Sequence, residues 1–131
     1  MFTNIDDTKV HDNNDGWIGV DLDGTLAQYT SFVDLYHIGE PIPLMVEQVQ
    51  RWLAAGKTVK IFTARVSCPS DHYQKVLSTI QAWCVQHIGI ALEVTNIKDL
   101  HMDELWDDRA VQVIKNTGTI AGFSTRGFDK I

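Results

Sequence analysis

Two pairs of aspartates each stand directly after a short apolar run of the chain: Asp21 with Asp23, and Asp107 with Asp108. If the two apolar runs are parallel strands of one sheet, their carboxyl ends meet at one edge, and all four side chains converge there. Carboxylates brought so close repel one another, and a divalent cation offsets that repulsion. One or two carboxylates together with water form the oxygen ligand set that Mg²⁺ prefers. We therefore expect a magnesium site among these four aspartates.

Other metal and phosphate motifs are excluded by residue type. A calcium loop opening at Asp21 would need an acidic or asparagine ligand, a glycine and a glutamate where the chain has Thr25, Leu26 and Phe32. The sequence contains no GxxxxGKS/T phosphate loop, no HExxH motif and no cluster of Cys and His that would indicate zinc. Ordinary turn aspartates explain each carboxylate taken singly, but they explain poorly two acidic pairs that both follow apolar strands.

Hydrophobic spacing predicts the elements that position these carboxylates. Apolar, mostly β-branched stretches predict strands at 17–20, 58–62 and 90–95. Apolar residues at helical spacing predict helices at 44–55, with Pro43 in the first turn, and at 70–88. The remaining expectations are a loop or flap at 26–43 and a short helical turn within 100–105. Residues 111–114 suit a strand or a short helix, and alternation with β-branched residues favours the strand. The alternation of strands and helices predicts an α/β fold with helices packed on a parallel sheet.

Composition limits what else the chain can do. It has 131 residues, of which 44% are hydrophobic and 21% charged, as expected of one globular domain. We expect that domain at 16–131, preceded by a flexible acidic tail at 1–15. The formal charge of −6 argues against a wide nucleic-acid-binding face. Two unpaired cysteines, with no signal peptide and no membrane-length apolar run, predict a cytoplasmic protein without membrane contact.

Three motifs, in this order along the chain, resemble those of the haloacid dehalogenase-like (HAD) phosphohydrolases. Residues 20–26, Val-Asp-Leu-Asp-Gly-Thr-Leu, are similar to the first motif, an apolar strand followed by DxDGT. Thr63 after Phe62 resembles the second motif, a Thr or Ser that ends the next core strand. Asp107 and Asp108 resemble the fourth motif, an acidic pair after an apolar strand.

The third motif of the family is a lone lysine, for which Lys98 is better placed than Lys60 or Lys115. The resemblance covers about residues 17–115 and implies a Rossmann-like three-layer α/β fold with a parallel central sheet. Members of the family often carry a cap domain between motifs. Here 26–43 is too short for a folded cap, so the chain is similar to the small capless type, with a flap over an open site.

The resemblance also implies a role for each motif residue. Asp21 matches the nucleophile that forms an aspartyl-phosphate, and Asp23 matches the general acid and base. The Thr63 hydroxyl is expected to hold a phosphoryl oxygen, and Lys98 to offset negative charge. The carboxylate of Asp21 and the backbone carbonyl of Asp23 are expected to bind Mg²⁺ together with Asp107, while Asp108 orients that shell or binds through water.

Substrate contacts are expected from residues beside the motifs, namely Gly24, Thr25 and Arg65. Arg65 and Arg109 each suit either a distal phosphate or carboxylate of the substrate, or a structural ion pair. The flap carries further candidates that either contact the substrate, for instance by stacking on a base, or anchor the flap on the core: Tyr29, Phe32, Tyr36 and His37.

These inferences predict a Mg²⁺-dependent phosphomonoesterase that acts on a small phosphorylated metabolite or nucleotide. An end-processing polynucleotide 3′-phosphatase is the alternative, because some such enzymes have the same DxDGTLA motif, and the acidic charge counts mildly against it. A non-catalytic HAD-like binding module is a further alternative, although no motif carboxylate is missing. The sequence leaves the oligomeric state open, a homo-oligomer included.

Overall fold

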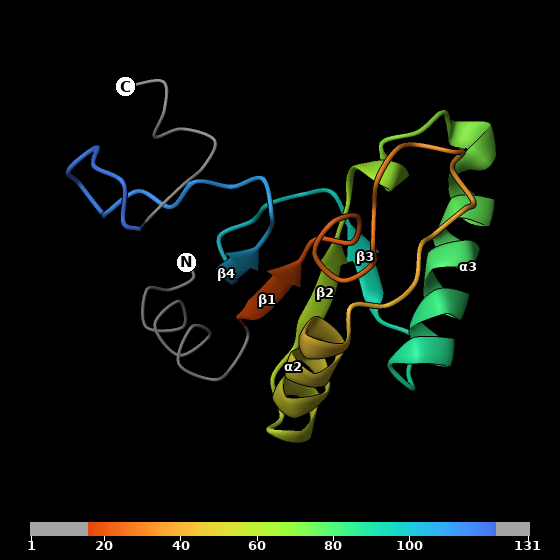
Figure 1. Ribbon diagram of the computed structural model, residues 1–131, viewed down its shortest axis with the longest axis horizontal. Helices are drawn as coiled ribbons and strands as arrows, with labels where there is room; N and C mark the ends of the chain where they lie inside the picture. The colour runs from red at the N-terminus through yellow and green to blue at the C-terminus, as the bar shows by residue number, and fades with distance from the viewer. Residues whose placement is uncertain (1–15, 123–131) are drawn as a thin grey trace, which may run out of the picture.

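Four parallel strands form one sheet in the order β3-β2-β1-β4 (Figure 1). They are β1 (Trp17–Val20), β2 (Val59–Phe62), β3 (Glu93–Thr95) and β4 (Met102–Trp106). The computed structural model describes residues 16–122. Strand β1 lies between β2 and β4, and its Val20 is paired with Ile61 on one side and with Trp106 on the other. The carboxyl ends of these three strands therefore lie at one edge of the sheet.

Two helices connect the first three strands, α2 (Pro43–Ala54) and α3 (Ser70–His87), and a short 3₁₀ helix, η1 (Ala64–Val66), follows β2. Their buried side chains, such as Val49 of α2 and Ile80 of α3, join one hydrophobic core with Val20 and Ile61. Val20 and Ile61 are paired and so point to the same face of the sheet. Both helices therefore pack on that face, where burying apolar surface stabilises the layers together.

The opposite face of the sheet is built around Trp17. The residue is 2% exposed, and its ring lies 6.5 Å from the ring of Phe62 and has the Lys60 ammonium 4.6 Å from its centroid. Its indole N–H donates to Asp99 at 2.8 Å. This face thus combines aromatic packing with a buried indole whose polar atom is satisfied.

The predicted fold class is confirmed: the chain is a Rossmann-like α/β protein with a four-stranded parallel sheet flanked by two helices. Of the three layers expected, residues 16–122 supply the sheet and one layer of helices. Among the described helices, none is long and apolar enough to cross a membrane. The expected tail at 1–15 lies outside the described residues, as does the end of the domain expected at 16–131.

Two local predictions were wrong at least in part. Of the helical turn expected within 100–105, residues 100 and 101 form a turn, while 102–105 belong to strand β4, whose Leu105 pairs with Gly19 of β1. Its sequence, MDELW, has no β-branched residue, so pairing with β1 rather than local propensity makes it a strand. The strand expected at 111–114 is reduced to a single bridge between Val113 and Ile120. Val113 is exposed, so no core contact extends that pairing into a strand.

Candidate active site

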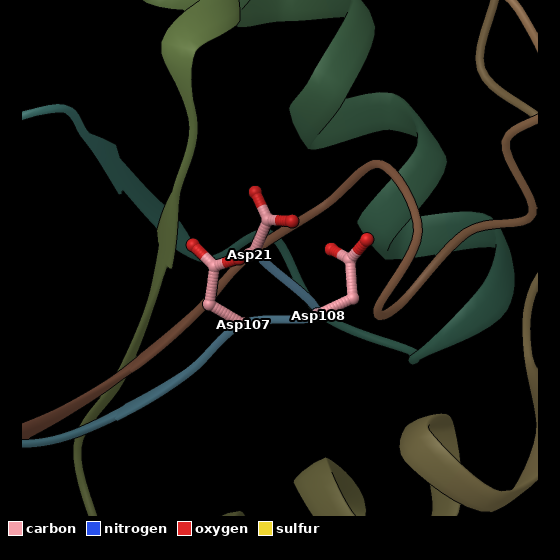
Figure 2. A group of neighbouring side chains, drawn as sticks. All are labelled: Asp21, Asp107 and Asp108. Carbon is pink, nitrogen blue, oxygen red and sulfur yellow. The ribbon is translucent and has the colours of Figure 1, made fainter. Parts of the chain in front are cut away.

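Asp21 and Asp107 lie side by side because β1 and β4 are adjacent parallel strands. Val20 is paired with Trp106, and the Asp21 backbone N–H donates to the Trp106 carbonyl at 2.9 Å. Asp21 is the first residue after β1, and Asp107 is the first residue after β4. Carboxylate oxygens of Asp21, Asp107 and Asp108 lie within 4.8 Å of one another, and Figure 2 shows the three side chains projecting to the same side. We call these three residues the acidic cluster.

The loop after Asp21 is held tightly by its own backbone. The Leu22 carbonyl accepts hydrogen bonds from the N–H groups of Leu26 at 3.0 Å and Ala27 at 2.9 Å. The Gly24 N–H donates to the Ala27 carbonyl at 2.8 Å, and Gly24 has a φ of 92°, a conformation that favours glycine. Leu22, Leu26 and Ala27 are fully buried and anchor the loop in the core.

Thr25 connects this loop to Asp108. Its hydroxyl donates to the Asp108 carboxylate at 3.1 Å and accepts the Asp108 backbone N–H at 2.9 Å. Gly24 lies against the same carboxylate, since a Cβ added there would be 2.6 Å from Asp108 Oδ2. Gly24 and Thr25 were expected to contact substrate, and the structure places both against Asp108. They set the orientation of one member of the acidic cluster.

The acidic cluster is electrostatically unfavourable without a cation. Burial, followed by the charge of Asp107 and contacts with Asp108, raises the pKa of Asp21 to about 8. A divalent ion beside these oxygens would reverse that effect by favouring the ionised carboxylates. The three aspartates therefore fit, and can hold, a metal ion. The Asp23 carboxylate lies outside this cluster and has a different partner.

Arg65 binds Asp23 and the flap at once. Its Nε donates to Asp23 Oδ2 at 2.8 Å and its Nη2 to Asp23 Oδ1 at 2.9 Å, a bidentate ion pair. Its remaining N–H groups donate to the backbone carbonyls of Asp34, Leu35 and His37. The side chain is 7% exposed. All five guanidinium donors are thus used within the protein. Of the two roles expected for Arg65, a substrate contact or a structural ion pair, this favours the ion pair.

A cavity of about 740 Å³ opens beside these groups at the carboxyl edge of the sheet. Thr63, 3% exposed, lies in its wall, and the Thr63 hydroxyl oxygen accepts the Arg65 backbone N–H at 3.1 Å. The hydroxyl hydrogen has no acceptor in that contact and can donate into the cavity. The other lining residues come from the flap and from three strand ends: Asp21, Asp23, Tyr29, Phe32, Leu35, Phe62, Ala64, Arg65, Asp107, Asp108, Arg109 and Ala110.

Not every predicted site residue lies at this cavity. Lys98 is exposed in the loop between β3 and β4 and does not line it. Arg109 does line the cavity, and the Arg109 backbone N–H donates to Asp107 Oδ1 at 2.8 Å. Four further cavity residues were not predicted: Leu35, Phe62, Ala64 and Ala110. For Phe62, alternation along the strand indicates only that it points away from the core, because Val59 and Ile61 point to it.

Comparisons with known proteins agree with this fold. No family model matches the chain, and no curated protein matches it. Among solved structures, it is similar to a conserved protein from Bacteroides thetaiotaomicron, with 22% identity, a TM-score of 0.50 and coverage of 72% of this chain and 76% of that one. At this identity the likeness shows the fold alone. The chain is thus a Rossmann-like α/β protein with three clustered aspartates at the carboxyl edge of its sheet.

Proposed function

We propose that the chain is a Mg²⁺-dependent phosphomonoesterase of the HAD type, acting on a small phosphorylated metabolite or nucleotide. The observation that carries this proposal is the position of Asp21, the first aspartate of the DxDGT sequence, beside Asp107 and Asp108 in one cavity. The role of Mg²⁺, bound by the acidic cluster, is to offset the negative charge of these carboxylates and of the phosphoryl oxygens.

The reaction begins with attack by an Asp21 carboxylate oxygen on phosphorus. A bond forms between that oxygen and phosphorus, and the bond to the leaving alcohol breaks. The electron pair of the broken bond goes to the leaving oxygen, which takes a proton from the Asp23 carboxyl group. Arg65 occupies one lone pair on each Asp23 oxygen, so a second lone pair on each remains for that proton.

A water molecule then completes the turnover. It attacks the phosphorus of the aspartyl-phosphate while Asp23, now a carboxylate, accepts its proton. The bond to Asp21 breaks, which restores the Asp21 carboxylate and releases inorganic phosphate. The Thr63 hydroxyl, in the cavity wall, donates to a phosphoryl oxygen during both steps of the proposed reaction.

The test is a phosphatase assay with Mg²⁺ over nucleotides, sugar phosphates and phosphorylated oligonucleotides. Chelation of Mg²⁺ and the Asp21→Asn substitution should each abolish phosphate release. The matched control is Asp103→Asn, which removes an exposed carboxylate of β4 that does not line the cavity. Robust turnover by the Asp21→Asn protein would contradict the mechanism. Hydrolysis confined to oligonucleotide ends would instead favour the end-processing alternative.

Mass spectrometry of the acid-quenched protein provides a second test. The wild type should carry one added phosphoryl group on the peptide that contains Asp21, and the Asp23→Asn protein should retain it longer, since the base for hydrolysis is lost. A chain that binds phosphomonoesters without ever forming this adduct or releasing phosphate would be a binding module.

A further inference from the structure

The flap aromatics fall into two groups with different surroundings. Tyr36 is an anchor, because its hydroxyl lies 2.6 Å from His72 Nδ1 and its ring 4.3 Å from the Lys75 ammonium, both on α3. Tyr29 and Phe32 are 47% and 59% exposed, and both line the cavity that holds the acidic cluster. Large exposed aromatic side chains that share one cavity wall are candidates for binding a ligand.

The cavity is larger than a phosphoryl group needs. Its volume of about 740 Å³ lies within the range of roughly 300–1,000 Å³ that is usual for sites binding whole small molecules. Its lining combines three acidic residues, Asp21, Asp107 and Asp108, with four large apolar or aromatic residues: Tyr29, Phe32, Leu35 and Phe62. A ligand that fills the cavity therefore carries an apolar group beside its phosphate.

The flap side of the cavity offers little for a second phosphate. Arg65 lies there, but all five of its N–H donors are used by Asp23 and by flap carbonyls. Asp23 and the acidic cluster would repel further negative charge. Aromatic side chains bind flat rings by stacking, and this interaction does not require a charged partner.

The flap backbone on both sides of Tyr29 and Phe32, the two residues that we call the aromatic wall, is held by hydrogen bonds. The two arms of the flap are joined by a hydrogen bond from the Gln28 N–H to the Glu40 carbonyl at 2.8 Å. The Trp83 indole of α3 donates to the Gly39 carbonyl at 3.0 Å, and Arg65 binds three further carbonyls between these points. A preorganised wall loses little conformational entropy when a ligand binds.

Resting on the proposed function, we infer that the substrate is a small phosphomonoester that carries an aromatic ring, and that Tyr29 and Phe32 bind the ring. A nucleoside monophosphate and an aryl-alkyl phosphate share this chemistry. We expect the cavity to discriminate against phosphates without an aromatic ring, such as those of sugars.

Two matched pairs of probes test the inference. Benzyl phosphate and cyclohexylmethyl phosphate are primary alkyl esters with the same carbon count, and they differ in whether the ring is flat and aromatic. Their phosphonates, in which phosphorus is bonded to carbon, cannot be hydrolysed at that position and report binding alone. Affinities with Mg²⁺ are measured by calorimetry, and hydrolysis of the phosphates by phosphate release.

We expect the wild type to bind the benzyl phosphonate about 10-fold more tightly than its cyclohexylmethyl partner, a typical effect of one stacked ring. Tyr29→Leu with Phe32→Leu keeps apolar bulk but removes both ring faces, so the preference should fall below about 3-fold. Val33→Ala is the control, since Val33 is an equally exposed flap residue outside this cavity, and it should retain the preference.

The outcomes separate the inference from the proposed function. Equal affinities in the wild type, or a preference that survives the double substitution, would overturn the aromatic wall even if both phosphates are hydrolysed. If the wild type hydrolyses neither phosphate, the proposed phosphatase activity is contradicted. The relative affinity for the two phosphonates still shows whether Tyr29 and Phe32 bind an aromatic ring. Tighter binding of a 3′-phosphorylated oligonucleotide than of the matching nucleoside 3′-monophosphate would overturn the assignment to a small substrate.

Discussion

Arg65 holds both carboxylate oxygens of Asp23, with Nε 2.8 Å from Oδ2 and Nη2 2.9 Å from Oδ1. The other donors of the same guanidinium fix the flap at the carbonyls of Asp34, Leu35 and His37. One buried side chain therefore sets the position of the proposed acid and base and the position of the cavity wall. Arg65 acts in this site as a positioning residue.

Arg65→Lys should lower kcat about 100-fold, the scale of loss that a misplaced reacting group causes, because lysine cannot form the two parallel bonds to Asp23. It should also increase cleavage of the flap in limited proteolysis, since three carbonyl contacts are lost. Arg51→Lys is the matched control, as Arg51 pairs with Glu47 on the exposed surface of α2 at 3.0 Å. Unchanged kcat and unchanged proteolysis in the Arg65→Lys protein would contradict the positioning role.

Asp21 should make the metal-free protein less stable as pH rises. Its pKa is about 8 in the folded state and 3.8 when unperturbed, so between these values the folded chain holds a proton that the unfolded chain has lost. Stability is then lost from about pH 4 to pH 8. Because water partly screens this site, we expect a total of about 1–2 kcal/mol.

Urea unfolding with a chelator between pH 5 and pH 9 measures this effect. The Asp21→Asn protein should show a flatter pH dependence than the wild type and should be the more stable of the two at pH 8. Saturating Mg²⁺ should stabilise the wild type and reverse that order, since the ion favours the ionised carboxylate. Parallel pH profiles for the two metal-free proteins would show that Asp21 titrates normally.

Gly24→Ala should weaken both folding and metal binding. Gly24 has a φ of 92°, and an added Cβ would lie 2.6 Å from Asp108 Oδ2, so the Asp108 carboxylate must move. Gly56→Ala isolates the backbone contribution, because Gly56 has a φ of 83° with nothing within 4 Å of the added Cβ. Both variants should lose about 1 kcal/mol of unfolding free energy to backbone strain. Only Gly24→Ala should also lower Mg²⁺ affinity, measured by calorimetry, and equal affinities in the two variants would contradict this.

Thr63→Val should reduce kcat about 100-fold, the usual cost of losing one donor to a developing negative charge. Thr63→Ser keeps the hydroxyl and should retain activity within about 5-fold of the wild type. Valine also removes the acceptor for the buried Arg65 N–H, so thermal unfolding of both variants must be compared with their kinetics. A valine variant as active as the serine variant would exclude a hydroxyl contact with the phosphoryl group.

The acidic cluster was predictable because it depends on two strong rules. The apolar run 17–20 is a strand, and parallel strands end at one edge, so Asp21 meets the pair that follows Trp106. Neither rule requires the exact bounds of β4. Asp21 was therefore correctly expected to meet Asp107 and Asp108, although a helical turn was expected within 100–105. A strand stabilised by its neighbour carries little signal in its own sequence.

The roles of Arg65 and of the flap could not be predicted from the sequence. The guanidinium donates to three backbone carbonyls about 30 residues earlier in the chain. Every residue has a backbone carbonyl, so no sequence motif indicates which carbonyls will accept these hydrogen bonds. Tyr36 and Phe32 look alike in sequence, yet only Tyr36 reaches His72 on α3. Which flap aromatic is an anchor depends on the path of the loop, and that path depends on Arg65.

The hydrogen bonds between Thr25 and Asp108 join residues 83 positions apart. During folding, β1 can pair with β2, and β2 with β3, and these strands can bury the helices before β4 takes its place at the edge of the sheet. Closing so long a loop is entropically costly and is favoured late, once a partner surface exists. We therefore expect the mutually repelling carboxylates to meet after the hydrophobic core has formed, so the folding nucleus of this protein need not contain the charges on which its proposed chemistry depends.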